Sequence, residues 1–203
     1  MDERKELFDA YVAQYNNVLS RMGYPAKNST GFTERNLSVN FSKVYEKKNP
    51  EAVSWFEFQW GENSNEHIDM VLKDVGSRTM FIVEAKRFSS PSGKIASIAS
   101  DIKRIPEFVE EMHSSERFDV LEGAECIYGM ILADVWVKKG GRTGTKKRIL
   151  KSFLDGTFLV GFRKELGLEE NELPVNPLYE TRKVKDVSSV EDYYLLAMMW
   201  RVK

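Results

Sequence analysis

The sequence contains few of the residues that build disulfide frameworks and zinc sites. It has one cysteine, Cys126, and two histidines, His67 and His113, among 203 residues. A single cysteine excludes an intramolecular disulfide and is typical of a protein in a reducing compartment. Neither histidine has a cysteine or a second histidine at zinc-ligand spacing, so no zinc site is expected.

Long apolar runs and an excess of one charge are also missing. No stretch approaches the roughly 18 consecutive apolar residues that suggest a transmembrane helix. The first residues, MDERKELF, are charged and lack the apolar core of a secretory leader. The 30 basic and 31 acidic residues give a net charge of −1, so the global balance indicates no particular partner. We expect a cytoplasmic protein with no membrane partner.

The chain does have the composition of a folded domain. Hydrophobic residues make up 42% of it and aromatic residues 12%, which is typical of a globular protein with a real core. The length fits a single domain over 1–203. Within it we expect an N-terminal helix in 1–25, a core over about 30–137 and a C-terminal extension over 138–203.

Hydrophobic spacing predicts the elements of this domain. Helical periodicity covers 3–22, and a second helix is expected from Thr33 as N-cap to the Asn49-Pro50 pair. After a loop through Ser89, Ser90, Pro91 and Gly93, a third helix carries Ile95 to Met112, with Pro106 kinking or restarting it. The expected strands cover 53–60, 67–73, 79–86 and 125–137, and VEDYYLLAMMWRV near the end is a strand or a buried helix. The predicted fold class is therefore α/β, a central mixed sheet flanked by helices in the order α-β-β-β-α-β.

The stretch from Ile68 to Phe88 predicts a hairpin that carries acidic residues. Gly76-Ser77 fits a two-residue type II′ turn, and this register pairs Asp69 with Glu84. Lys86 shares the face of Glu84 because strands alternate with period two. A turn with an odd number of residues would instead pair Asp69 with Val83 or Ala85 and turn it away. His67 is expected on the opposite face from Asp69, in a structural or surface role.

Two facing carboxylates repel each other unless a cation lies between them, so this hairpin predicts a metal site. Carboxylate oxygens suit Mg²⁺ or Mn²⁺, and such an ion can activate water and neutralise charge at a phosphoryl centre. A nearby lysine can orient that water or stabilise the phosphate. Glu34, on the apolar side of the second helix, is a further member. As alternatives, Lys73 and Lys86 could neutralise Asp69 and Glu84 on an exposed face, and the helix dipole alone explains Glu34.

With these residues in place, the sequence resembles the PD-(D/E)XK nuclease superfamily, which has the restriction-endonuclease-like fold. The resemblance rests on Ile68-Asp69, on Glu84-Ala85-Lys86 and on the order of elements over about 30–137; Ile68 replaces the proline that gives the motif its name. It implies that Asp69 and Glu84 bind Mg²⁺ or Mn²⁺, that Lys86 acts near the attacking water and that Glu34 supports the site. It also implies that polar groups of the following helix face the site or DNA, here Lys94, Asp101, Lys103 and Arg104.

A basic segment, KKGGRTGTKKR over 138–148, indicates contact with nucleic-acid phosphates. An ordinary solvated turn is the alternative. The cationic residues of the segment are Lys138, Lys139, Arg142, Lys146, Lys147 and Arg148.

The sequence therefore predicts a magnesium- or manganese-dependent nuclease acting on DNA. Nothing in the residues separates DNA from RNA, so a ribonuclease is one alternative. A catalytically silent nucleic-acid-binding or scaffold protein of the same fold is another. Members of this fold often act as dimers, which makes a homodimer compatible with the sequence.

Overall fold

A computed structural model describes residues 3–22, 34–60, 66–88, 91–114, 119–138 and 190–202. Its helices are α1 (Glu3–Met22), α2 (Arg35–Lys48) and α3 (Pro91–Ser114), with a short 3₁₀ turn at Asp119–Leu121. Its strands are β1 (Ala52–Gln59), β2 (His67–Asp74), β3 (Thr79–Phe88), β4 (Cys126–Lys138) and β5 (Val190–Arg201). The terminal segment is thus a strand, one of the two structures expected for it.

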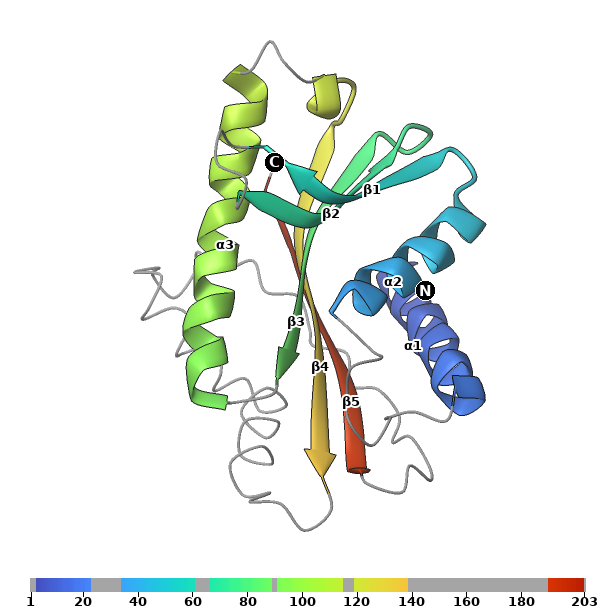
Figure 1. The fold of residues 1–203 in the computed structure, drawn as a ribbon. Helices are drawn as coiled ribbons and strands as arrows, with labels where there is room; N and C mark the ends of the chain where they lie inside the picture. Colours follow the sequence, from blue (N-terminus) through green and yellow to red (C-terminus); the bar gives the residue numbers. More distant parts are fainter. Residues whose placement is uncertain are drawn as a thin grey trace.

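The five strands form one mixed sheet in the order β1-β2-β3-β4-β5. β1, β2 and β3 are antiparallel neighbours, β3 and β4 are parallel, and β5 returns antiparallel to β4. The parallel pair needs a crossover, which α3 supplies between β3 and β4 (Figure 1). The predicted α/β architecture with a mixed, helix-flanked sheet is confirmed.

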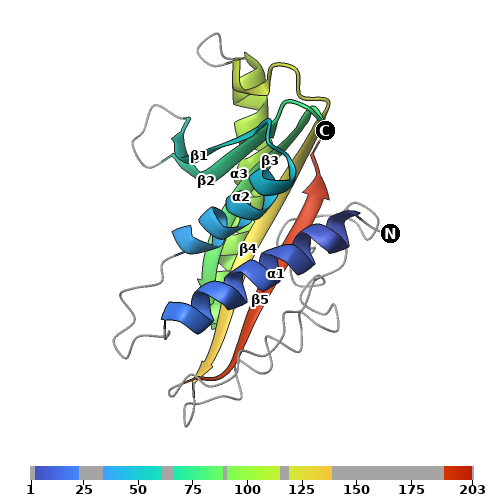
Figure 2. The same cartoon turned by 90° about the vertical axis from the view of Figure 1, so that its right-hand side faces the viewer.

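The sheet separates two hydrophobic cores. α3 covers one face, where Ile105 and Phe108 pack with Met80 and Ile82 of β3. α1 and α2 cover the other face, and Figure 2 shows both on the near side of the sheet, with α3 behind. Because β3 alternates between the two cores, an even-numbered side chain on it points toward α3. Glu84 and Lys86 follow that alternation.

The β2–β3 hairpin has the predicted register but not the predicted turn. Five pairs, from Asp74↔Thr79 to Met70↔Val83, follow the expected ladder. The loop, however, contains four residues, Val75–Arg78. Gly76 lacks the positive φ that a type II′ turn requires, and Arg78 instead has φ 54°. Register survives because both loops are centred between Gly76 and Ser77, so the wider loop omits only the pair of Val75 with Arg78.

Asp74 explains why the wider loop forms. Its carboxylate accepts hydrogen bonds from the backbone N–H of Gly76 and of Ser77 and from the Ser77 hydroxyl, at 3.0, 3.2 and 2.8 Å. An Asp side chain that binds the N–H groups of the residues following it stabilises an open loop in place of a tight two-residue turn. The type II′ prediction overlooked this competing acceptor.

Three other boundaries differ from expectation. The N-cap of α2 is Glu34 and not Thr33. Pro91 and Gly93, expected in a loop, belong to the first turn of α3, where proline is tolerated because its missing N–H would have no helical partner. α3 then continues through Pro106 as one helix instead of restarting. The apolar residues Ile149, Leu150, Phe153 and Leu154 predict a further helix, and they lie outside the described residues.

Within the described residues, the helices are either too short or too polar to span a bilayer.

Candidate metal-binding site

Charged side chains of β3 and α3 form a cluster on the face of the sheet that α3 covers. Arg104 Nη2 lies 2.5 Å from Glu84 Oε1, and Lys86 Nζ lies 3.0 Å from Asp101 Oδ2. Arg104 Nη2 also lies 3.3 Å from Asp101 Oδ1, one turn back on α3. The four side chains therefore form a continuous ion-pair network between strand and helix.

Burial dominates the electrostatics of Glu84. The residue is 1% exposed, with Met80 and Ile82 on the same face of β3. Burial, and then the negative charge of Asp69, raise the pKa of Glu84 to about 8, against the opposing effect of Arg104. The positive charge near Glu84 is therefore too small to offset the cost of burying its ionised carboxylate.

The other members of the network respond to the same field. Burial also raises the pKa of Asp101, although Lys86 and Arg104 oppose the rise. Burial lowers the pKa of Lys86, but the attraction of Asp101 outweighs it and the net pKa is raised. Arg104 behaves in the same way beside Glu84. Both cations thus remain charged at neutral pH.

Asp69 lies next to this network, at the point where β2 leaves β3. The ladder ends at Met70↔Val83, one step before Asp69 would pair with Glu84. The Asp69 carboxylate instead accepts a hydrogen bond from the Ala85 N–H, with Oδ2 at 2.6 Å. Asp69 also raises the pKa values of Glu84 and Asp101. The structure therefore brings Asp69, Glu84 and Lys86 into one electrostatic neighbourhood.

Glu34 reaches the same edge of β3 from α2. Its side chain makes no capping hydrogen bond to its own helix, and Oε1 instead accepts from the Arg87 N–H at 2.7 Å. The N–H groups of Ala85 and Arg87, two residues apart, are about 7 Å from each other along the strand. Asp69 and Glu34 therefore bind successive N–H groups on the same edge of β3, beyond the point where the β2–β3 ladder ends.

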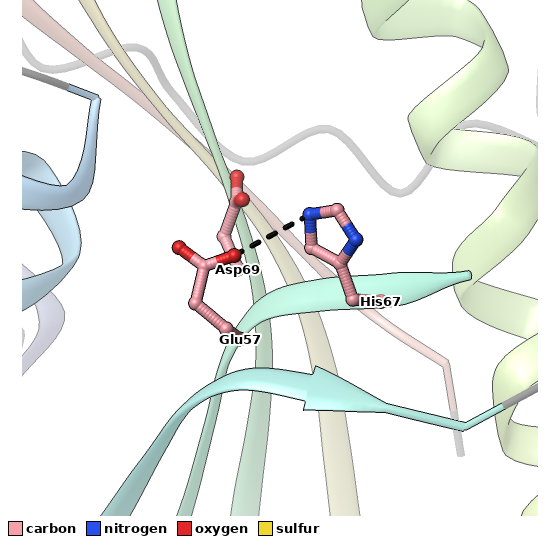
Figure 3. A group of neighbouring side chains, drawn as sticks. All are labelled: Glu57, His67 and Asp69. Carbon is pink, nitrogen blue, oxygen red and sulfur yellow. Dashed lines mark ion pairs between the residues drawn. The ribbon is translucent and has the colours of Figure 1, made fainter. Parts of the chain in front are cut away.

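A second group of ligating side chains shares Asp69. Figure 3 shows Glu57, His67 and Asp69 as neighbouring side chains. One ligand atom from each lies within 4.8 Å of the other two. The Glu57 carboxylate is also engaged by His67 at 3.4 Å and by Arg35 at 3.0 Å. The expectation that His67 and Asp69 occupy opposite faces is wrong, because the ligand atoms of the two side chains lie within 4.8 Å of each other.

The backbone around this second group is distorted. Glu57 has φ 53° in the middle of β1, a conformation that is rare for residues other than glycine. On either side of it, Phe56 packs toward α2 while Phe58 lies in the core under α3. Met70 and Ile68 of β2 change faces in the same way. In β1 and in β2, the side chains on either side of Glu57 and of Asp69 therefore point to opposite faces of the sheet.

Of the polar residues suggested for the crossover helix, two face the site. Asp101 and Arg104 belong to the network, Lys103 is exposed to solvent, and the side chain of Lys94 lies outside the described residues. The position of Asp101 has a signal in the sequence. It follows Ile98 by three residues and therefore continues the apolar stripe of the helix.

Sequence reasoning missed Glu57, His67 and Asp134. Asp134 is fully buried in β4, on the face opposite Glu84, and its Oδ2 lies 3.2 Å from Arg87 Nη2. An acid inside the apolar run ILADVWV is the same signal that singles out Glu84 in MFIVEA. Applied consistently, that signal finds Asp134.

The residues present suit a divalent cation. Three carboxylates, from Asp69, Glu84 and Asp101, face two cations, Lys86 and Arg104, so the ionised cluster carries one excess negative charge. Carboxylate oxygens are the preferred donors for Mg²⁺ and Mn²⁺. Asp69 and Glu84 could hold such an ion, with Glu57 and His67 as further donors beside Asp69.

The structure does not describe the side chains of the basic segment that is expected to contact nucleic acid. Lys138 is the last residue of β4, and its side chain is not described. Lys139, Arg142, Lys146, Lys147 and Arg148 lie outside the described residues.

Comparison of this chain with models of protein families, with curated proteins and with solved structures finds no match.

Proposed function

We propose that this chain is a metal-dependent nuclease that hydrolyses phosphodiester bonds in DNA. The observation that carries the proposal is the buried acid Glu84, with Lys86 two residues on and Asp69 beside it at the end of the ladder. The order of elements and the Glu-x-Lys strand fit the resemblance to the PD-(D/E)XK nucleases.

In this proposal Asp69 and Glu84 hold the ion, and Glu34 supports the site from α2. A bound Mg²⁺ or Mn²⁺ would lower the pKa of water and neutralise charge on the phosphoryl group. Lys86 can donate a hydrogen bond to the attacking water or to a phosphate oxygen. Asp101 holds the Lys86 ammonium at 3.0 Å, which fixes its direction and keeps it charged. Asp101 is therefore a positioning residue for Lys86.

A catalytically silent nucleic-acid-binding or scaffold protein is the second candidate. The observation that favours it is the ion-pair network itself, because Glu84 and Lys86 each already have a partner of opposite charge. Buried ion pairs of this kind also occur for purely structural reasons. Activity and metal dependence separate the two candidates.

The test is a cleavage assay on supercoiled plasmid, single-stranded DNA and RNA in Mg²⁺, Mn²⁺ or EDTA. We expect cleavage of DNA with either metal and none in EDTA. The variants Lys86→Ala and Asp69→Asn should each lower the rate by about 100-fold or more. Lys73→Ala, which removes a half-buried lysine elsewhere on β2, is the matched control and should cleave normally.

Three results would change the proposal. Cleavage that persists in Lys86→Ala would assign the activity to another site. Cleavage of RNA alone would make the protein a ribonuclease. A folded protein that cleaves no nucleic acid would support the scaffold candidate.

A further inference from the structure

Arg104 occupies a position on Glu84 where a metal ion would also bind. Its Nη2 lies 2.5 Å from Glu84 Oε1, while Asp101 Oδ1 is a second, longer partner at 3.3 Å. The two carboxylates are 1% and 7% exposed as side chains, whereas the Arg104 side chain is 29% exposed. Arg104 is thus the more exposed, cationic partner of two buried acids, Glu84 and Asp101.

The same carboxylate cannot hold a guanidinium and a divalent cation at full strength. Both are positive, and in a poorly solvated site their repulsion is large. An ion at Glu84 therefore weakens the Glu84–Arg104 contact, and Arg104 in turn weakens binding of the ion. Thermodynamic linkage requires this effect to be equal in both directions.

Arg104 has a place to go when it leaves Glu84. Asp101, three residues back on α3, already accepts it at 3.3 Å and can anchor the side chain. Arg104 Nε is buried and has no hydrogen-bond partner within the described part of the chain. The guanidinium therefore has donors to spare, and its planar fork suits the two oxygens of a phosphodiester.

We propose that Arg104 holds Glu84 in the metal-free protein and, once a divalent cation binds there, presents its guanidinium to the scissile phosphodiester. The inference rests on the proposed nuclease function and adds a substrate-binding residue to it. Asp101 then serves both cations of the site, positioning Lys86 through Oδ2 and Arg104 through Oδ1. Charge also balances, because an ion added to the cluster leaves one positive charge, which matches one phosphodiester.

The test separates metal affinity from cleavage. Mn²⁺ binding to the full chain is titrated by calorimetry and by the loss of the free Mn²⁺ EPR signal, for wild type, Arg104→Ala and Arg104→Lys. We expect Arg104→Ala to bind Mn²⁺ roughly 10-fold more tightly, because the competing cation is gone. With Mn²⁺ saturating, the same variant should cleave DNA about 100-fold more slowly, because a donor to the phosphate is lost.

Two variants complete the design. Arg104→Lys keeps the charge without the fork, so it should bind Mn²⁺ like wild type but recover only part of the cleavage rate. Glu107→Gln removes an exposed charge on α3 that has no assigned role in the site and should change neither measurement. If Arg104→Ala proves unfolded by circular dichroism, Arg104→Gln, which retains much of the side-chain volume, takes its place.

The outcomes distinguish this inference from the proposed function. If wild type cleaves DNA but Arg104→Ala binds Mn²⁺ no more tightly, competition for Glu84 is refuted. If affinity rises while cleavage is unchanged, the phosphate contact is refuted. If wild type cleaves no nucleic acid, the nuclease function and with it the phosphate role fail, and the Mn²⁺ titration still decides the competition.

Discussion

Glu84 has an unusual position for an acid, 1% exposed on the face of β3 that packs under α3. Its folded pKa of about 8 exceeds the value of 4.5 expected for an unfolded glutamate. The folded protein therefore binds a proton more tightly than the unfolded chain does. The contribution of this proton to the free energy of unfolding is fully present below the unfolded pKa. It is lost as the pH rises through the folded pKa.

This shift predicts a pH-dependent free energy of unfolding for the metal-free protein. Between about pH 4.5 and pH 8, it should fall as the pH rises, by at most about 1.4 kcal/mol per pH unit. Glu84→Gln cannot ionise and should remove this slope. Urea unfolding in EDTA at several pH values measures both. Glu107→Gln, an exposed change on α3, is the control, and equal slopes in wild type and Glu84→Gln would contradict the assignment.

Gly129 shows the opposite requirement, a side chain that must be absent. It pairs with Trp200 of β5, and a Cβ at this position would overlap the indole ring. Gly129→Ala should therefore lower the free energy of unfolding by about 1–3 kcal/mol, as overpacking does in tight cores. A double-mutant cycle with Trp200→Leu checks the cause, since the smaller side chain should remove much of the penalty. Additive effects would show that the indole is not responsible.

Among the elements, the β2–β3 hairpin depends on Asp74. Besides its three loop contacts, the carboxylate accepts a hydrogen bond from the Tyr45 hydroxyl of α2 at 3.0 Å. Asp74→Ala should cost at least about 2 kcal/mol of unfolding free energy, because several charge-assisted hydrogen bonds are lost together. Tyr45→Phe removes only the contact with α2 and should cost about 1 kcal/mol. Urea unfolding compares the two, and equal losses would mean that the loop contacts contribute nothing.

Much of this element structure could be predicted from local patterns. The helical spacing of α1 and α2 and the apolar run of β4 define the layers, because burial selects residues with the period of the element. The hairpin register was also predictable, since Gly76-Ser77 marks the centre of the loop in both the predicted and the observed turn. The turn type was not, because it depends on the Asp74 side chain, which binds the N–H groups of Gly76 and Ser77 and stabilises a wider loop.

The candidate site was predictable only in part. Glu84 and Lys86 share a face by strand alternation, and Asp69 follows from the register. The partners of these residues depend on how α3 packs on the sheet, which places Arg104 on Glu84 and Asp101 on Lys86. The proximity of Glu57 to Asp69 depends on a backbone conformation that sequence patterns do not indicate. Local rules identify the strand, and tertiary packing selects the partners.

At the scale of the whole molecule, the site adds polar links between elements that the strand ladders and the two apolar cores already hold together. β2, β3 and α3 all contribute charged groups to it, and Glu34 adds a contact from α2. A ligand that binds such a junction in the folded state alone must stabilise the whole domain. Thermal unfolding is therefore a direct readout of metal binding.

We expect Mn²⁺ at about 100 times its dissociation constant to raise Tm by about 5–10 °C for a domain of this size. EDTA should reverse the shift. Asp69→Asn should abolish it, because Asp69 belongs to both groups of candidate ligands. Glu107→Gln should leave it intact. A shift that persists in Asp69→Asn would place the ion elsewhere in the molecule.

The four-residue loop at Val75–Arg78 also sets a rule for insertions and deletions. Adding or removing two residues keeps every cross-strand pair of β2 and β3, so Asp69 still meets the Ala85 N–H. Adding or removing one gives a loop of odd length, which hairpins take up in the loop itself, by a bulge beside it or by a slip of the ladder, and a slip points Asp69 to the wrong face. Natural or engineered length variants of this loop should therefore retain metal binding in steps of two.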